Sequence, residues 1–123
     1  MGPCSTAGSS TTSDLKGRQP SMHKLLVLYP EPADRGTFDT YYRATHLPLV
    51  RKLPGVRDVQ YSLGLTGDPY YAVFEATFDS TEQFAAAMSS AEGQAVAADV
   101  PNYATGGAVV IDFAVTSDEH AAA

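Results

Sequence analysis

One histidine, His46, interrupts an apolar stripe in a segment with the spacing of a helix. The helix is predicted to begin at Thr37, and its stripe consists of Phe38, Tyr42, His46, Leu49 and Leu53. An imidazole has an unperturbed pKa near ~6.5, and partial burial favours the neutral form, which can accept a proton or bind a metal. Two interpretations stay open: an acid/base residue, or a structural histidine bonded to a nearby carbonyl or tyrosine.

Pro48 lies two residues after His46 and is expected to disturb the helix there. Proline has no N–H to donate, and it disfavours the helical conformation of the preceding residue, Leu47. The helix is therefore predicted to kink or restart near His46, which fixes the direction in which the imidazole points.

Tyrosines form the second group with chemical potential. They are Tyr29, Tyr41, Tyr42, Tyr61, Tyr70, Tyr71 and Tyr103. A tyrosine suits an apolar pocket in which one hydroxyl orients a ligand, and it is equally common in half-buried sheets and at dimer interfaces. Tyr42 precedes His46 by one helical turn on the same face, so the two can share a pocket. Tyr103 falls in a segment predicted to be a Gly-rich loop before the last strand.

Metal, phosphate and acyl-transfer chemistry find little support. No second histidine or carboxylate stands at metal-ligand spacing from His46, because His23 falls in a predicted strand and His120 in the C-terminal tail. No metal site is therefore expected. The pair Gly106-Gly107 lacks the lysine and the following helix of a phosphate loop, and no nucleophile motif marks an acyl-transfer site.

The elements that position these residues follow the order strand, helix, strand, strand, helix, strand. Apolar runs and alternation predict strands at 23–29, 59–63, 70–78 and 108–115. Helices are predicted at 37–53, from 81 after a capping box at 80–83, and at 91–100, with Pro101 ending the helix and a loop at 102–107. This order predicts an α+β fold, a βαββαβ domain whose antiparallel sheet carries both helices on one face.

The sheet is predicted to be apolar on both faces. Strands 23–29 and 70–78 are central in this topology, and the second of them places Tyr71 and Val73 on the face opposite Phe74. A lone two-layer domain would leave that helix-free face wet, so a partner must cover it. Two sheets packed face to face form a dimeric α+β barrel, and we expect the chain to be a homodimer.

Composition limits the partners and the location. The 123 residues carry a net charge of -6, which repels phosphate backbones and anionic lipid, so neither nucleic acid nor a membrane is an expected partner. No apolar run approaches the ~20 residues of a bilayer span. The single cysteine, Cys4, leaves no intrachain disulfide, which suits the reducing cytoplasm. Residues 1–21 are predicted to be a disordered tail, 22–116 the folded domain and 117–123 a frayed C-terminal tail.

Four segments, 23–30, 41–49, 90–93 and 101–107, carry a family resemblance. The more specific are His-Leu-Pro-Leu after a Phe-x-x-Tyr-Tyr helix and Asn-Tyr-Ala-Thr-Gly-Gly. Together they resemble the EthD family, named after ethyl tert-butyl ether degradation. The resemblance implies a ferredoxin-like fold that dimerises as an α+β barrel, with His46 as the acid/base residue and Tyr42, Asn102 and Tyr103 as substrate-binding residues. Members are often labelled oxidoreductases, but no nicotinamide or flavin motif occurs here, and no cofactor is expected.

Two functions follow from these observations. The first is a small oxidoreductase-type or acid/base enzyme that acts on a compact hydrophobic organic molecule in a catabolic or biosynthetic pathway, with His46 moving a proton in a pocket between the first helix and the sheet. The alternative is a non-catalytic binding module that serves a separate oxidative degradation system. A structural dimer without a pocket would instead fill the space around His46 with Tyr42 and Leu49.

Overall fold

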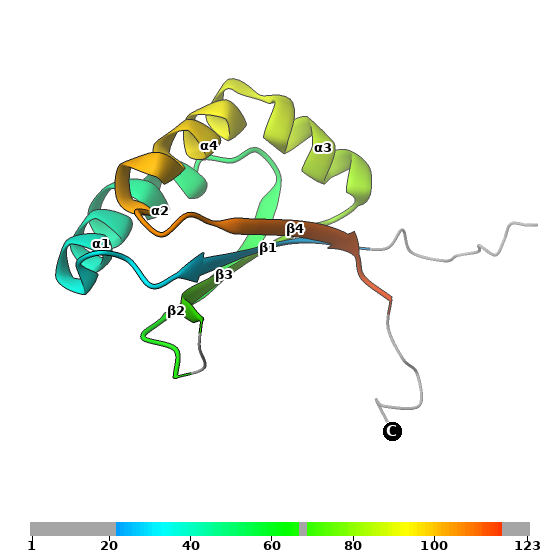
Figure 1. Cartoon of the computed structure of the whole chain (residues 1–123). Coiled ribbons are helices and arrows are strands. Elements are labelled where there is room, and N and C mark those ends of the chain that lie inside the picture. The colour runs from blue at the N-terminus through cyan, green and yellow to red at the C-terminus, as the bar shows by residue number, and fades with distance from the viewer. Residues whose placement is uncertain (1–21, 67–68, 117–123) are drawn as a thin grey trace, which may run out of the picture.

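A four-stranded antiparallel sheet carries all the helices on one face (Figure 1). The computed structural model describes residues 22–66 and 69–116. The strands are β1 (His23–Pro30), β2 (Val56–Leu63), β3 (Tyr70–Phe78) and β4 (Val109–Ala114), and their order in the sheet is β2-β3-β1-β4. The predicted α+β fold and the central position of β1 and β3 are confirmed. The predicted tails at 1–21 and 117–123 lie outside the described residues.

The first helical unit is continuous but changes type in its middle. It consists of α1 (Arg35–Tyr41), the π-helical segment η2 (Tyr42–His46) and α2 (Leu47–Val50). Asp34 caps its start, because the Asp34 side chain accepts a hydrogen bond from the backbone N–H of Thr37.

The predicted disturbance near His46 takes the form of this π-turn. The backbone N–H of Leu47 donates to the carbonyl of Tyr42, five residues earlier, and the wider turn makes room for the ring of Pro48. The turn also shifts the buried stripe beyond His46. Leu47 and Val50 are buried, whereas Leu49, which the regular helical spacing placed on that stripe, is only partly buried.

A β-bulge at Tyr71 corrects one predicted strand face. Tyr29 pairs with Ala72 and Pro30 with Tyr70, so Tyr71 is the extra residue in β3. Its ring packs edge-on against Phe38 of α1, at a centroid distance of 5.5 Å. The prediction that Tyr71 lies on the helix-free face is therefore wrong.

The second helical unit also differs from prediction at its end. It consists of α3 (Thr81–Ser89) and α4 (Ala91–Tyr103), capped by the side chains of Ser80 and Ser90. Pro101 does not end α4, since the N–H of Ala104 still reaches the carbonyl of Val100 at 2.9 Å. Tyr103 therefore belongs to the last helical turn and not to a loop.

The helix-free face is apolar mainly along β1 and β4. The register places Leu26 opposite Ile111 and Lys24 opposite Phe113, and Ile111 and Phe113 are 44% and 43% exposed. Lys24 forms an ion pair with Glu75 of β3 at 3.4 Å, so the centre of this face is mixed in character. In the described ranges 22–66 and 69–116, no helix combines the length and the apolar character that crossing a bilayer requires.

Gly93 fixes how closely the two C-terminal helices approach. A Cβ at this position would lie 2.3 Å from the carbonyl oxygen of Ala87, a backbone atom that cannot rotate away. We therefore expect Gly93→Ala to lower the free energy of unfolding by about 1–3 kcal/mol, measured by urea denaturation. Gly36→Ala is the matched control, since its Cβ meets no atom closer than 3.4 Å and alanine favours helix by up to about 1 kcal/mol. Equal urea midpoints for Gly93→Ala and Gly36→Ala would contradict the close approach of α3 and α4 at Gly93.

Candidate active site

His46 and Asp99 form a buried pair between the two helical units. The Nδ1 atom of His46 lies 2.9 Å from Oδ2 of Asp99 on α4, and the two residues are only 3% and 7% exposed. A carboxylate can only accept a hydrogen bond, so the Nδ1 of a neutral His46 carries the proton. Burying both groups is tolerable because each satisfies the other.

Asp99 receives two further hydrogen bonds. The Tyr41 hydroxyl donates to Oδ1 at 2.6 Å, and the Asn102 amide donates to the same oxygen at 3.0 Å. Burial works to raise the pKa of Asp99, but the hydrogen bonds from Tyr41, Asn102 and His46 outweigh it and hold that pKa below its usual value. Asp99 is therefore a carboxylate at neutral pH.

Two tyrosine rings pack against the imidazole. His46 stacks on Tyr42 at a centroid distance of 5.5 Å and lies 4.6 Å from the ring of Tyr103. The hydroxyls of Tyr29 and Tyr103 are 2.6 Å apart, and burial raises the pKa of Tyr29, Tyr42 and Tyr103, so all three are neutral phenols. The Tyr42 hydroxyl is buried with no hydrogen-bond partner among the described residues, which is costly in a native fold.

The sequence-predicted site residues are thus only partly brought together. Tyr42 and Tyr103 both contact His46, whereas Asn102 is exposed and reaches the site through Asp99. Asp99 was missed by the sequence analysis. The signal for it was the spacing of Gly93, Val96 and Tyr103, the buried side of α4, on which Asp99 also falls.

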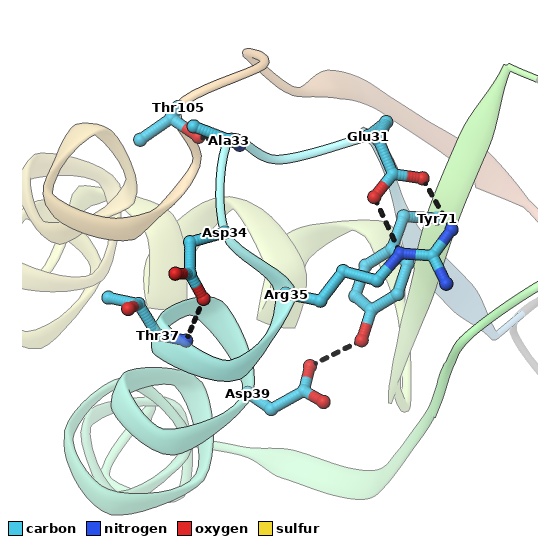
Figure 2. Close-up of polar contacts among 8 residues, drawn as sticks. All are labelled: Glu31, Ala33, Asp34, Arg35, Thr37, Asp39, Tyr71 and Thr105. Carbon is cyan, nitrogen blue, oxygen red and sulfur yellow. Dashed lines mark hydrogen bonds and ion pairs between the residues drawn. The ribbon is translucent and has the colours of Figure 1, made fainter.

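Polar contacts at the start of α1 hold this helical unit against the sheet (Figure 2). Arg35 forms two hydrogen bonds with Glu31, and its guanidinium lies 4.9 Å from the centre of the Tyr71 ring. The Tyr71 hydroxyl donates to Asp39 at 2.7 Å. The loop before α1 is also tied to the chain after α4, because the N–H of Ala33 donates to Thr105 at 2.8 Å. The two helical units that meet at His46 are therefore also connected beyond the C-terminal end of β1.

His46 lines none of three surface hollows found within residues 22–66 and 69–116. The largest, about 680 Å³, lies on the outer side of α1 and η2 and includes Thr37 and Tyr41. The second, about 240 Å³, lies between α2 and α4, and the third, about 200 Å³, lies beside β2 and Val73. Tyr42 and Tyr103 both pack against the imidazole, whereas Leu49 is only partly buried.

A second buried histidine lies at the start of β1. His23 contacts Thr81 Oγ1 through Nδ1 at 3.0 Å and Asp112 through Nε2 at 2.8 Å, and it stacks on Phe84. These contacts join β1, β4 and α3. Within residues 22–66 and 69–116, no group of three or more histidine, cysteine, aspartate or glutamate side chains is arranged to hold a metal ion.

The fold and the histidine–aspartate pair under its helices define a ferredoxin-like α+β protein with a buried polar site. Residues 30–107 match the EthD domain, which is well over half of the 123 residues. The chain belongs to the EthD family, and the resemblance seen in the sequence is confirmed.

Relatives above 25% identity agree with this assignment. An uncharacterized 11.0 kDa protein of the thcB–thcC intergenic region of Rhodococcus erythropolis is 36% identical over 96 residues, which cover 73% of this chain and 91% of that protein. An EthD family protein of Bacillus halodurans C-125 is 33% identical, with a TM-score of 0.71, covering 77% of this chain and 99% of that one. An EthD-like protein of Ralstonia eutropha JMP134 is 26% identical, with a TM-score of 0.64, and the match covers 81% of this chain and 96% of that one.

More distant structures share the fold alone. A hydroxynitrile lyase from Passiflora edulis is 16% identical, with a TM-score of 0.66, and the match covers 80% of this chain and 97% of that one. A dimeric ferredoxin-like protein of unknown function from Thermobifida fusca YX is 17% identical, with a TM-score of 0.62, and the match covers 79% of this chain and 93% of that one. Differently described proteins therefore share this architecture, so the function must be argued from the site.

The burial of His46 predicts a pH-dependent stability. Burial lowers the pKa of His46, and Asp99 offsets this only in part, so the native state takes up the proton less readily than the unfolded chain. As the pH falls through about 6.5, the unfolded chain binds a proton that the native state rejects, so the free energy of unfolding falls.

We expect the stability difference between wild type and His46→Gln to shrink from pH 7 to pH 5.5, by at most about 1.4 kcal/mol per pH unit. Urea denaturation at a series of pH values measures it. Above pH 8 the same difference should not depend on pH, which is the internal control. A constant difference across the whole range would contradict a lowered pKa.

Proposed function

We propose that this EthD protein is a small acid/base or oxidoreductase-type enzyme that acts on a compact hydrophobic organic molecule, with His46 transferring the proton. The observation that carries the proposal is the buried imidazole, whose pKa is lowered by burial and which lies among tyrosine rings beside a carboxylate. A neutral imidazole at pH 7 has a free lone pair for a proton, as a general base requires. Perturbed ionisable groups of this kind concentrate at functional sites.

The surroundings of His46 indicate what kind of molecule it would meet. A group that gives its proton to the imidazole would lie against the rings of Tyr42 and Tyr103, which are apolar bodies with hydroxyl tips. The unpartnered hydroxyl of Tyr42 would donate to an oxygen of the ligand. Such surroundings favour a compact, neutral and mostly apolar ligand.

A second candidate is a binding module without catalysis. It is favoured by the near-complete burial of His46, which is 3% exposed and lines none of the three described hollows. In this role the chain would carry a hydrophobic compound for a separate oxidative system. A cytoplasmic location stays a prediction for either function.

We further propose that two copies associate through the helix-free face of the sheet to form a homodimer. Ile111 and Phe113 on β4 are each more than two-fifths exposed there, next to Leu26 and Leu28 on β1. Exposed apolar residues on a contiguous sheet face indicate an interaction surface. Two proteins of the same fold are described as dimeric, one from Thermobifida fusca YX and one from Bacteroides fragilis.

Replacement of His46 tests the enzyme proposal. Turnover of a panel of small aromatic and ether-like compounds should fall about 100-fold or more in His46→Gln, because a positioned general base contributes about 10²–10⁴ in rate. His23→Gln is the matched control, since His23 is also buried and bonded to an aspartate but lies outside the site. Full turnover in His46→Gln would remove this residue from the mechanism, and a compound that raises the melting temperature without being converted would favour the binding module.

The dimer is tested by placing a charge on each side of β4. Ile111→Glu adds a carboxylate to the helix-free face and should produce monomers in sedimentation velocity runs, because an unpaired charge is costly to bury. Val110→Glu is the control, since Val110 is 61% exposed and lies one residue along, on the other side of the strand. A monomeric wild type, or a dimer that survives Ile111→Glu, would contradict the proposed interface.

A further inference from the structure

We infer that Asp99 is a positioning residue that keeps the proton of His46 on Nδ1 and thereby leaves Nε2 as the atom that exchanges a proton with substrate. Tyr41 and Asn102 serve this role from outside the site by holding the carboxylate in place. The consequence for turnover rests on the proposed function, whereas the position of the proton on the imidazole does not.

The two oxygens of Asp99 have different partners. Oδ1 accepts from both Tyr41 and Asn102, at 2.6 Å and 3.0 Å, and Oδ2 lies 2.9 Å from Nδ1 of His46. Tyr41 directly precedes the π-turn that carries His46, and Asn102 lies on the same helix as Asp99. The carboxylate is therefore fixed to both helical units, and its orientation cannot change without breaking two hydrogen bonds.

This arrangement decides which tautomer of His46 exists. Oδ2 can only accept, so the proton of neutral His46 must be on Nδ1. In residues 22–66 and 69–116, the described contacts of the imidazole give a hydrogen bond at Nδ1 and none at Nε2. The free nitrogen is on the other side of the imidazole from the carboxylate, and the imidazole contacts the rings of both Tyr42 and Tyr103.

The same contacts predict what an amide would do at position 99. In Asp99→Asn the side chain keeps its size, but one oxygen becomes an NH2 group. Tyr41 and Asn102 are both donors, so they hold the amide oxygen at the Oδ1 position and leave the NH2 group facing Nδ1 of His46. An NH2 group needs an acceptor, so His46 must move its proton to Nε2 and lose its free lone pair on the substrate side.

A purely structural role would give a different result. If the Asp99 contacts only fastened α4 to the first helical unit, Asp99→Asn would change stability and leave the tautomer as it was. The tautomer is therefore the measurement that separates the two roles. Long-range nitrogen–proton NMR spectra of protein with ¹⁵N-labelled histidine report it directly for the full chain, with no substrate required.

We expect wild-type His46 to carry its proton on Nδ1 at neutral pH, and Asp99→Asn to carry it on Nε2. The variant Asp99→Asn/Tyr41→Phe/Asn102→Ala lacks both outer donors, so its amide can rotate and the Nδ1 proton should return at least in part. Asp112→Asn is the matched control, because Asp112 binds the other buried histidine, His23, and should leave the His46 signals unchanged.

The kinetic readout is a split between kcat and KM. With a compound that wild type converts, Asp99→Asn should lower kcat about 100-fold or more with little change in KM, as expected when the base is present in the wrong tautomer.

A wild-type proton on Nε2, or an Asp99→Asn spectrum with the wild-type tautomer, would overturn the inference. A changed tautomer with unchanged turnover would instead leave Asp99 as the positioning residue and reject His46 as the base, so the two proposals fail separately. If Asp99→Asn does not fold, the wild-type spectrum alone tests the inference: a proton on Nδ1 of His46 supports it, and a proton on Nε2 overturns it.

Discussion

The hydrogen bond between His46 and Asp99 is the contact on which the helical layer depends. An imidazole and a carboxylate are both expensive to bury, and each is tolerated only because the other satisfies it. The pair therefore restricts how η2 and α4 can lie over the sheet. Tyr41 and Asn102 complete the shell around the carboxylate, so three elements converge on a single side chain.

Departures from regular secondary structure place two aromatic residues, Tyr71 and Tyr103, in the layer between the helices and the sheet. The π-turn instead changes which residues are buried after His46, so that Leu47 and Val50 face the core in place of Leu49. A bulge turns Tyr71 toward α1, where Arg35 and Asp39 bind it. Continuation of α4 through Pro101 brings Tyr103 against the imidazole. The bulge and the continued helix thus each add one aromatic residue to the layer between helices and sheet.

The two faces of the sheet have different characters. The helix-covered face holds an aromatic cluster with the hydrogen-bonded His46–Asp99 pair beside it, while the opposite face exposes Ile111 and Phe113 near the Lys24–Glu75 ion pair. The proposed chemistry and the proposed dimer therefore use separate surfaces. The EthD match at 30–107 spans His46, Asp99 and the central strand β3, whereas β4 and all of β1 but Pro30 lie outside it.

Sequence periodicity determined the fold class, the central strands, the starts of α3 and α4 and the placement of His46 on a buried helical stripe, because these depend on local spacing and on burial patterns that repeat along the chain. It did not determine that Leu49 leaves the buried stripe, that Tyr71 changes face or that Tyr103 is helical. A π-turn, a bulge and a helix that tolerates proline are each stabilised by contacts from distant segments. The partner of His46 was also beyond the sequence, since Asp99 lies 53 residues away and meets it only once α4 has packed beside η2. Local pattern therefore singled out His46, and tertiary packing decided which of its two nitrogens faces the Asp99 carboxylate.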